Sequence, residues 1–356
     1  MKNDAHSDGS ETLHGRIDDA LDRRGFSTGR LRARAAAVVL ALSLLPIGAA
    51  GFAAYRLTNL GGPDRLCDGA VTADQVHGLL GGGRVEDGTW TSYSTTEDSS
   101  GNSCTVRVRS GLFETSEKHV QFTIARNADD GPGELAASNA RLFSGDSAGS
   151  VTPGVAWAVL PEGCQKGVRI EVRTNDAGGD EARARAAVAF ANGVAKARSC
   201  GDRVLPAPTS LSAVGAETEP DWNNLCGLPG FAPAKNPEAQ WRIPQQVTTA
   251  TAPIWSCKLG GDPRYDGRVQ QFAITTEPQA TALTRKDGEQ DSAVGRARWV
   301  AGGTLTATCQ GKDVFFTIKG GYLKDTQSPF LFPDQQDLVR QFLTAGGKAI
   351  GCEPIL

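Results

Sequence analysis

Two sets of four cysteines constrain the possible folds of this chain more than any other feature. Cys67, Cys104, Cys164 and Cys200 recur as Cys226, Cys257, Cys309 and Cys352, with offsets of 159, 153, 145 and 152 residues. An even number of widely spaced cysteines is typical of a disulfide framework in an oxidising compartment. The repeat is too long for a solenoid unit, so it indicates two tandem domains of ordinary size.

Short segments of sequence recur together with the cysteines. Residues 121–124 (QFTI) match residues 271–274 (QFAI), and the segment ending at Trp157 matches the segment ending at Trp299 with one inserted residue. An ordered series of such matches indicates tandem duplication. It also places the two tryptophans at equivalent positions, where both are expected to lie in the core.

Each repeat is expected to be an α+β domain in which helices cover one face of an antiparallel sheet. Thr72 can cap a helix over residues 73–80, and the Ala-rich segment 180–197 is the expected closing helix of the first repeat. The closing helix of the second repeat is expected over 334–344, with Gly346-Gly347 as its stop. Alternating apolar residues predict strands near 104–109, 120–125, 156–160, 168–172, 269–275, 298–301, 305–309 and 314–318, and a further helix is expected near 133–142.

Residues 35–55 are uncharged and long enough to cross a bilayer, because twenty-one helical residues span about 30 Å. Five arginines lie within residues 23–34, whereas only Arg56 and Arg65 follow closely. The positive-inside bias therefore predicts a single-pass protein of the cell membrane with a cytoplasmic N-terminus and an extracytoplasmic bulk. Two alternatives remain open, a cleaved secretory signal and a twin-arginine signal at Arg23-Arg24.

The expected fold is thus a single N-terminal transmembrane helix followed by two tandem, homologous, disulfide-stapled α+β domains. The expected boundaries are a cytoplasmic tail at 1–34, the transmembrane helix at 35–55, a linker at 57–66, domain 1 at 67–203, a second linker at 204–223, and domain 2 at 224–356.

Duplication of a foldable unit requires that each set of four cysteines be paired within its own repeat, which leaves three possible pairings for each set. The preferred pairing joins first to fourth and second to third, because domain termini commonly lie close together. It predicts the bridges Cys67 with Cys200, Cys104 with Cys164, Cys226 with Cys352, and Cys257 with Cys309. Pairing first with second and third with fourth is the close rival.

Ser147 is the one candidate nucleophile, because residues 145–149 match the G-x-S-x-G pattern of serine hydrolases. An α/β-hydrolase triad needs a histidine after the serine. The four histidines, His6, His14, His77 and His119, all precede it. We therefore expect a Gly/Ser turn. The cysteines lack C-x-x-C spacing, so no metal site is predicted from them. Because the sequence offers no catalytic set, no catalytic residue and no cofactor site are predicted either.

The charge pattern narrows the class of partner. A net charge of −3 with interspersed signs lacks the concentrated basic face that nucleic acid needs, so no nucleic-acid partner is expected. The expected function is a non-catalytic, membrane-anchored binding or scaffold protein, with an envelope component, a peptide or a small molecule as partner. One alternative is a membrane sensor that signals through its short cytoplasmic tail, and another is a serine hydrolase using Ser147.

The start of the first repeat resembles an actinobacterial domain of unknown function found in secreted and membrane-anchored envelope proteins. That domain begins with a cysteine, continues with a "leucine, threonine, acidic" helix start and a closing Leu-Gly, and carries further cysteines on its strands. The resembling segments here are Leu66-Cys67, the stretch 71–76 (VTADQV) and Leu79-Leu80-Gly81. The resemblance implies an envelope location and no catalytic residues.

Overall fold

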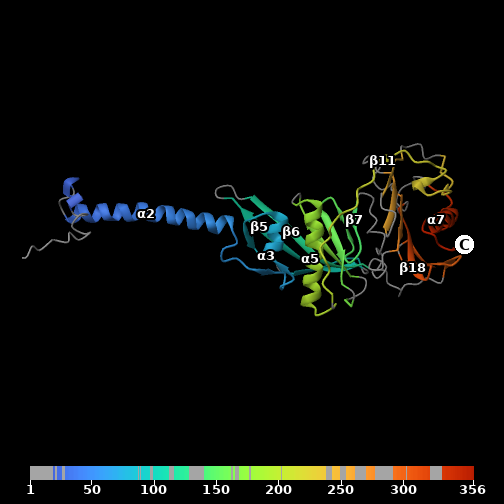
Figure 1. Cartoon of the computed structure of the whole chain (residues 1–356), viewed down its shortest axis with the longest axis horizontal. Helices are drawn as coiled ribbons and strands as arrows, with labels where there is room; N and C mark the ends of the chain where they lie inside the picture. Colours follow the sequence, from blue (N-terminus) through green and yellow to red (C-terminus); the bar gives the residue numbers. More distant parts are fainter. Residues whose placement is uncertain are drawn as a thin grey trace, which may run out of the picture.

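The computed structural model shows one long helix followed by two lobes (Figure 1). It describes residues 19–20, 22–25, 29–86, 88, 90–96, 99–111, 116–127, 140–161, 163–164, 168–175, 178–201, 203–237, 243–248, 254–260, 270–276, 292–301, 303–320 and 331–356. We call residues 65–205 the first lobe and residues 217–356 the second lobe.

Helix α2 (Gly29–Leu57) projects away from both lobes (Figure 1). It contains the whole of the expected transmembrane segment, 35–55. Among the side chains that the structure describes, no helix is both long enough and apolar enough to cross a membrane. The side chains of residues 41–48, in the middle of the expected segment, lie outside the described part of the chain.

The first lobe contains one large antiparallel sheet and two helices. In chain order its elements are β1 (Arg65–Leu66), β2 (Val71–Thr72), α3 (Ala73–Leu80), β3 (Arg84–Glu86), β4 (Trp90–Thr96), β5 (Ser99–Ser110), β6 (Ser116–Asn127), β7 (Arg141–Phe143), β8 (Gly149–Thr152), β9 (Val155–Val159), β10 (Val168–Thr174) and α5 (Asp180–Ala197). The strand order in the sheet is β3-β5-β6-β10-β9-β8-β7, with β4 paired to β5.

The second lobe has a similar construction. Its elements are β11 (Glu217–Thr218), the 3₁₀ turn η1 (Leu225–Gly227), β12 (Gln245–Val247), β13 (Ile254–Leu259), β14 (Gln270–Thr275), β15 (Ala293–Val294), β16 (Ala297–Ala301), β17 (Thr304–Cys309), β18 (Lys312–Gly320) and α7 (Gln335–Ala349). The strand order is β11-β12-β13-β14-β18-β17-β16-β15. Leaving out β4 and β11, this order matches that of the first sheet strand for strand.

The α+β prediction is therefore confirmed, and several elements begin and end where they were expected. Helix α3 starts at Thr72 with a capping box, in which the Thr72 hydroxyl accepts from the backbone N–H of Gln75 and the Gln75 side chain accepts from that of Thr72. All eight expected strands lie within or overlap observed ones. The helix expected near 133–142 lies largely outside the described residues, and its last two positions belong to β7.

The expected stop of the last helix at Gly346-Gly347 is wrong, because α7 continues to Ala349. Both glycines are buried where the helix packs closely. A Cβ atom on Gly346 would lie 2.7 Å from the side chain of Ile274, and one on Gly347 would lie 2.9 Å from that of Ile355. These glycines allow close packing and do not end the helix.

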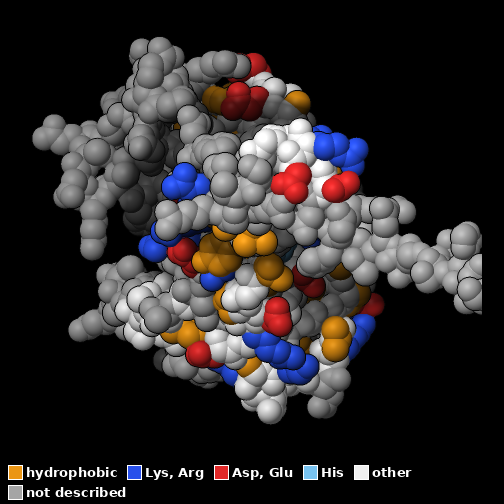
Figure 2. Space-filling view, turned by 90° about the vertical axis from the view of Figure 1, so that its left-hand side faces the viewer, with side chains coloured by type: hydrophobic (Ala, Val, Ile, Leu, Met, Phe, Trp, Pro, Cys, Tyr) orange, Lys and Arg blue, Asp and Glu red, His pale blue; other side chains and the backbone are white. Residues whose placement is uncertain are grey.

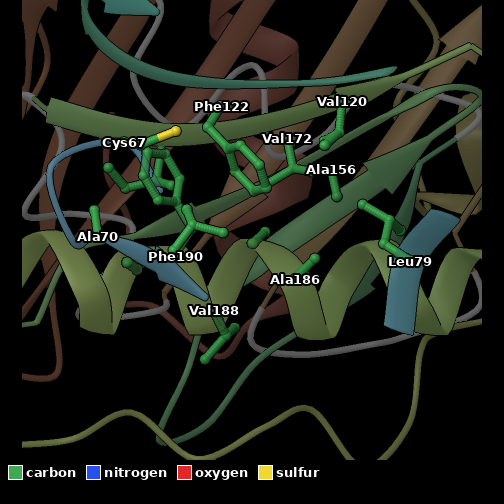
Figure 3. Packing of buried hydrophobic residues seen from close by; sticks show 14 of the residues in the cluster. Cys67, Ala70, Leu79, Val120, Phe122, Ala156, Val172, Ala186, Val188 and Phe190 are labelled. Carbon is green, nitrogen blue, oxygen red and sulfur yellow. The ribbon is translucent and has the colours of Figure 1, made fainter. Parts of the chain in front are cut away.

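Three buried clusters give the chain a layered arrangement of helix, sheet, sheet and helix. The first cluster lies between the first sheet and helices α3 and α5, where Phe122 and Phe190 meet with ring centroids 5.0 Å apart (Figure 3). The second lies between the second sheet and α7. In the third, Ile254 of the second sheet packs with Trp157 and Val159 of the first, so the outer faces of the two sheets are in contact.

The two lobes also correspond in detail. Phe342 of α7 packs on Phe272 at 5.1 Å, as Phe190 packs on Phe122. The same separation of 152 residues relates Phe190 to Phe342 and Cys200 to Cys352. Each closing helix ends with the same hydrogen bond, from the cysteine N–H to the carbonyl oxygen five residues earlier, at 2.9 Å in both lobes.

The expected equivalence of Trp157 and Trp299 is wrong. Trp157 lies on β9, whereas Trp299 lies on β16, which occupies the place of β8 in the sheet order. The residues that occupy equivalent places in the two sheets are instead Gly154, in the turn between β8 and β9, and Gly303, in the turn between β16 and β17. Each accepts a 2.8 Å hydrogen bond from the last strand of its sheet before the closing helix. Trp157 is buried as expected, but Trp299 is only partly buried.

All eight cysteines form disulfides, and each set is paired within its own lobe. The preferred pairing of first with fourth is nevertheless wrong. The bridges are Cys67–Cys104, Cys164–Cys200, Cys226–Cys257 and Cys309–Cys352. In the first lobe, the segment at Cys67 packs against β5, while α5 ends beside the connection between β9 and β10. The first and last cysteines therefore meet different partners.

Candidate functional site

A cleft of about 840 Å³ opens in the second lobe between α7 and strands β15, β16 and β18. Its volume lies within the range of small-molecule sites. The described residues that line it are Ser292, Ala293, Val294, Gly295, Trp299, Gly303, Ile318, Gly320, Gln335, Gln336, Val339, Arg340 and Leu356.

The floor of the cleft is apolar. Trp299 pairs across the sheet with Leu305, and Ile318 pairs with Phe272, so both side chains lie on the sheet face that α7 covers. Val339 approaches from α7 and is 8% exposed. The cleft is thus a place where the core between the sheet and α7 is open to the surface.

The rim of the cleft is polar and carries one positive charge. Gln336 and Arg340 lie one turn apart on α7 and are exposed. Within the described part of the chain, the guanidinium of Arg340 has no ion pair or hydrogen bond. The acidic residues at the start of α7 are engaged elsewhere. The Asp334 carboxylate accepts from the backbone N–H of Asp337, and the Asp337 carboxylate accepts from the side chain of Gln341.

Residues 353–356 form a further wall, which Arg296 holds in place. The backbone N–H of Arg296 donates to the carbonyl of Ile355 at 2.7 Å, and its side chain donates to the carbonyls of Pro354 and Glu353, both at 2.8 Å. Hydrogen bonds from backbone N–H groups, its own and that of Gln310, lower the pKa of Glu353, and the nearby charge of Arg296 adds to this. The wall is therefore fixed from several sides.

The corresponding place in the first lobe is filled. With the separation of 152 residues, Gln336, Val339 and Arg340 correspond to Ala184, Ala187 and Val188. These three residues of α5 are at most 1% exposed. Small side chains let α5 pack across β8, β9 and β10, whereas the main strand contact of α7 is β18.

Ser147, the sequence candidate for a nucleophile, does not lie in a hydrolase-like setting. It is buried in the turn between β7 and β8, so no helix follows it as a nucleophile elbow requires. The neighbouring Asp146 pairs with Arg203.

The two histidines that the structure describes make contacts with residues other than Ser147. His77 Nε2 lies 3.0 Å from the carbonyl oxygen of Gly83, and His119 lies on β6 beside Arg107 of β5. His6 and His14 lie outside the described residues. In the described ranges, no three His, Cys, Asp or Glu side chains come together in a group that could hold a metal ion.

The structure leaves the described surface mixed in charge. Basic and acidic side chains are interspersed on the face that Figure 2 shows, where hydrophobic side chains gather near the middle. No protein-family model, curated protein or solved structure matches the chain. The geometry of the cleft is therefore the main guide to function.

Sequence reasoning missed the cleft, although one signal for it is present in the sequence. Aligning the closing helices by Cys200 and Cys352 shows that buried alanine and valine positions of the first become Gln336 and Arg340 in the second. Polar residues at positions that are covered in the matching helix predict that this face of α7 is not fully covered.

Proposed function

We propose that this protein is a membrane-anchored, extracytoplasmic binding protein whose second lobe holds a small ligand. The observation that carries the proposal is the cleft beside α7, at a place where the first lobe is closed by Ala184, Ala187 and Val188. In this proposal the two lobes arose by tandem duplication, and the second became open for binding while the first stayed closed. The shared strand order and disulfide pattern support the duplication.

The proposed location rests on the N-terminal part of the chain. The uncharged segment 35–55, the arginines that precede it and the disulfides that follow it all favour an anchor with the lobes outside. The resemblance to actinobacterial envelope proteins points the same way. Protease added outside intact cells should digest the lobes and spare residues 1–34, and digestion of that tail would contradict the proposed topology.

Binding can be tested on the full chain in lipid nanodiscs with the fluorescent probe 1-anilinonaphthalene-8-sulfonate, using empty nanodiscs as the blank. We expect saturable binding that Gln336→Trp abolishes, because the indole would occupy the rim of the cleft. Arg185→Trp, at an exposed position of α5 far from the cleft, is the matched control and should bind as wild type does. Equal binding by wild type and Gln336→Trp would count against a site in the cleft.

Sensing is a second candidate function, which the joint between α2 and the first lobe favours. Arg84 of β3 stacks on the ring of Tyr55 at 4.1 Å and donates to the carbonyl of Leu60. The Asn59 side chain accepts from the N–H of Val85 at 3.1 Å. Such a joint can pass a movement of the lobe on to the helix. Hydrogen exchange of residues 55–60, measured in the full chain with and without 1-anilinonaphthalene-8-sulfonate, would test it, and unchanged exchange on saturation with the probe would contradict it.

A further inference from the structure

We propose that the ligand of the cleft is an amphiphile with a single acidic head and an apolar chain. The inference rests on the proposed function and specifies the chemistry of the same site. The head would pair with Arg340 at the rim, and the chain would lie along Trp299, Ile318 and Val339.

The acidic head follows from the charges around the cleft. Arg340 has the one charged side chain among the described lining residues, and its guanidinium has no partner within the described ranges. A carboxylate can accept two parallel hydrogen bonds from a guanidinium. The side chain of Gln336, one turn before Arg340 on α7, supplies a further donor for the same oxygens. A cationic head would instead be repelled by Arg340.

The apolar chain follows from the floor. The side chains of Trp299, Ile318 and Val339 offer no strong acceptor, and the indole N–H is the only donor among them. A peptide lying on this floor would bury backbone N–H and C=O groups without partners, which is unfavourable. A hydrocarbon chain has no such groups and gains from leaving water.

The position of Arg340 at the rim favours a ligand whose acidic group lies at one end of its apolar chain. Arg340 lies on the exposed side of α7, while the apolar residues lie deeper, between the helix and the sheet. An amphiphile can therefore insert its chain and keep its head at the rim. Because Val188 stands in place of Arg340 and is buried, the described residues of the first lobe do not repeat these contacts, and one ligand is expected for each chain.

Three eight-carbon probes that differ only in the head test the inference: octanoate, octanol and octylammonium. Equilibrium dialysis is performed with the full chain in nanodiscs, and empty nanodiscs are subtracted. We expect octanoate to bind about two- to fivefold more tightly than octanol, as an exposed charge-assisted pair allows, and octylammonium to bind most weakly. Arg340→Gln should remove the preference for octanoate and leave octanol binding unchanged. Arg185→Gln should change neither.

The outcomes separate this inference from the proposed function. Equal binding of all three probes, lost in Gln336→Trp, would overturn the acidic head and leave the cleft as a binding site. Retention of the octanoate preference in Arg340→Gln would overturn the role of Arg340. If Gln336→Trp reduces the binding of none of the three probes, and the fluorescent probe does not bind either, both proposals are overturned.

Discussion

Replacing Gly193 with alanine tests how closely α5 approaches the start of the first lobe. In an isolated helix this change stabilises by about 1 kcal/mol, because alanine has the higher helix propensity. Here a Cβ atom at position 193 would lie far closer than 3.0 Å to the carbonyl oxygen of Ala70, a separation that Cβ atoms essentially never show. The obstacle is backbone, so no side-chain rotation can relieve it.

The loop at Ala70 also has little freedom to move away. Its N–H donates to the carbonyl of Cys67 at 3.2 Å, and Cys67 is bridged to Cys104 of β5. Overpacking of this kind costs about 1–3 kcal/mol, occasionally more. Because the obstacle is backbone, the upper part of this range, about 2–3 kcal/mol, applies. After subtracting the gain in propensity of about 1 kcal/mol, Gly193→Ala should destabilise the first lobe by about 1–2 kcal/mol, which lowers its melting temperature by roughly 2–8 °C for a domain of this size.

The assay is differential scanning calorimetry of the full chain with its disulfides intact, and the transition of the first lobe is followed. Gly78→Ala in α3 is the matched control, because no atom lies within 4 Å of its would-be Cβ. That change should stabilise by about 0.5–1 kcal/mol. The two substitutions are therefore expected to shift the transition in opposite directions. If Gly193→Ala raises the melting temperature as Gly78→Ala does, α5 does not pack on Ala70 as described.

Further predictions concern the sheet interface, the linker and the disulfides. Thr275→Val should be neutral or stabilise slightly, because this buried hydroxyl has no partner in the described part of the chain. Thr317→Val should destabilise by about 1 kcal/mol, because it breaks a 3.1 Å hydrogen bond to Thr304. Urea unfolding of the two variants measures both changes in stability. The Asn224 side chain lowers the pKa of Asp221, so the stability from this turn is complete above the ordinary pKa of about 3.9 and is lost as pH falls through the lower folded value. Amide shifts of the turn that move well above pH 4 would contradict this. Non-reducing digestion should link the first cysteine of each set to the second and the third to the fourth. Any bridge between lobes would contradict the fold.

Local signals predicted the parts of the fold whose causes lie within a few residues. Helix α3 is an example, since Thr72 and Gln75 provide both halves of its capping box and Gly81 follows its last residue. The strands around residues 121–124 and 271–274 were likewise identified from alternation, and both repeats turned out to share one strand order.

The errors concern features that depend on distant contacts. Gly346 resembles a helix stop in the sequence, but its reason is the side chain of Ile274, which lies more than seventy residues earlier. The match between Trp157 and Trp299 followed local letters, whereas a bulge in β16 and the turn glycines set the true correspondence. The cleft has the same character, because it depends on where α7 lies over the sheet, with β18 as its main strand contact.

The disulfide pattern has a consequence for biogenesis. Each bridge joins cysteines 31 to 43 residues apart, and none encloses another. If the lobes are exported from the anchor toward the C-terminus, as in the topology proposed above, the first cysteine of each bridge meets its partner as the next one to emerge, so oxidation in order of arrival yields the native set. A nested pattern would have required Cys67 to remain unpaired while two other cysteines passed. With the proposed topology, the lobes would acquire their native bridges in the order of export, with little need for an isomerase to correct them.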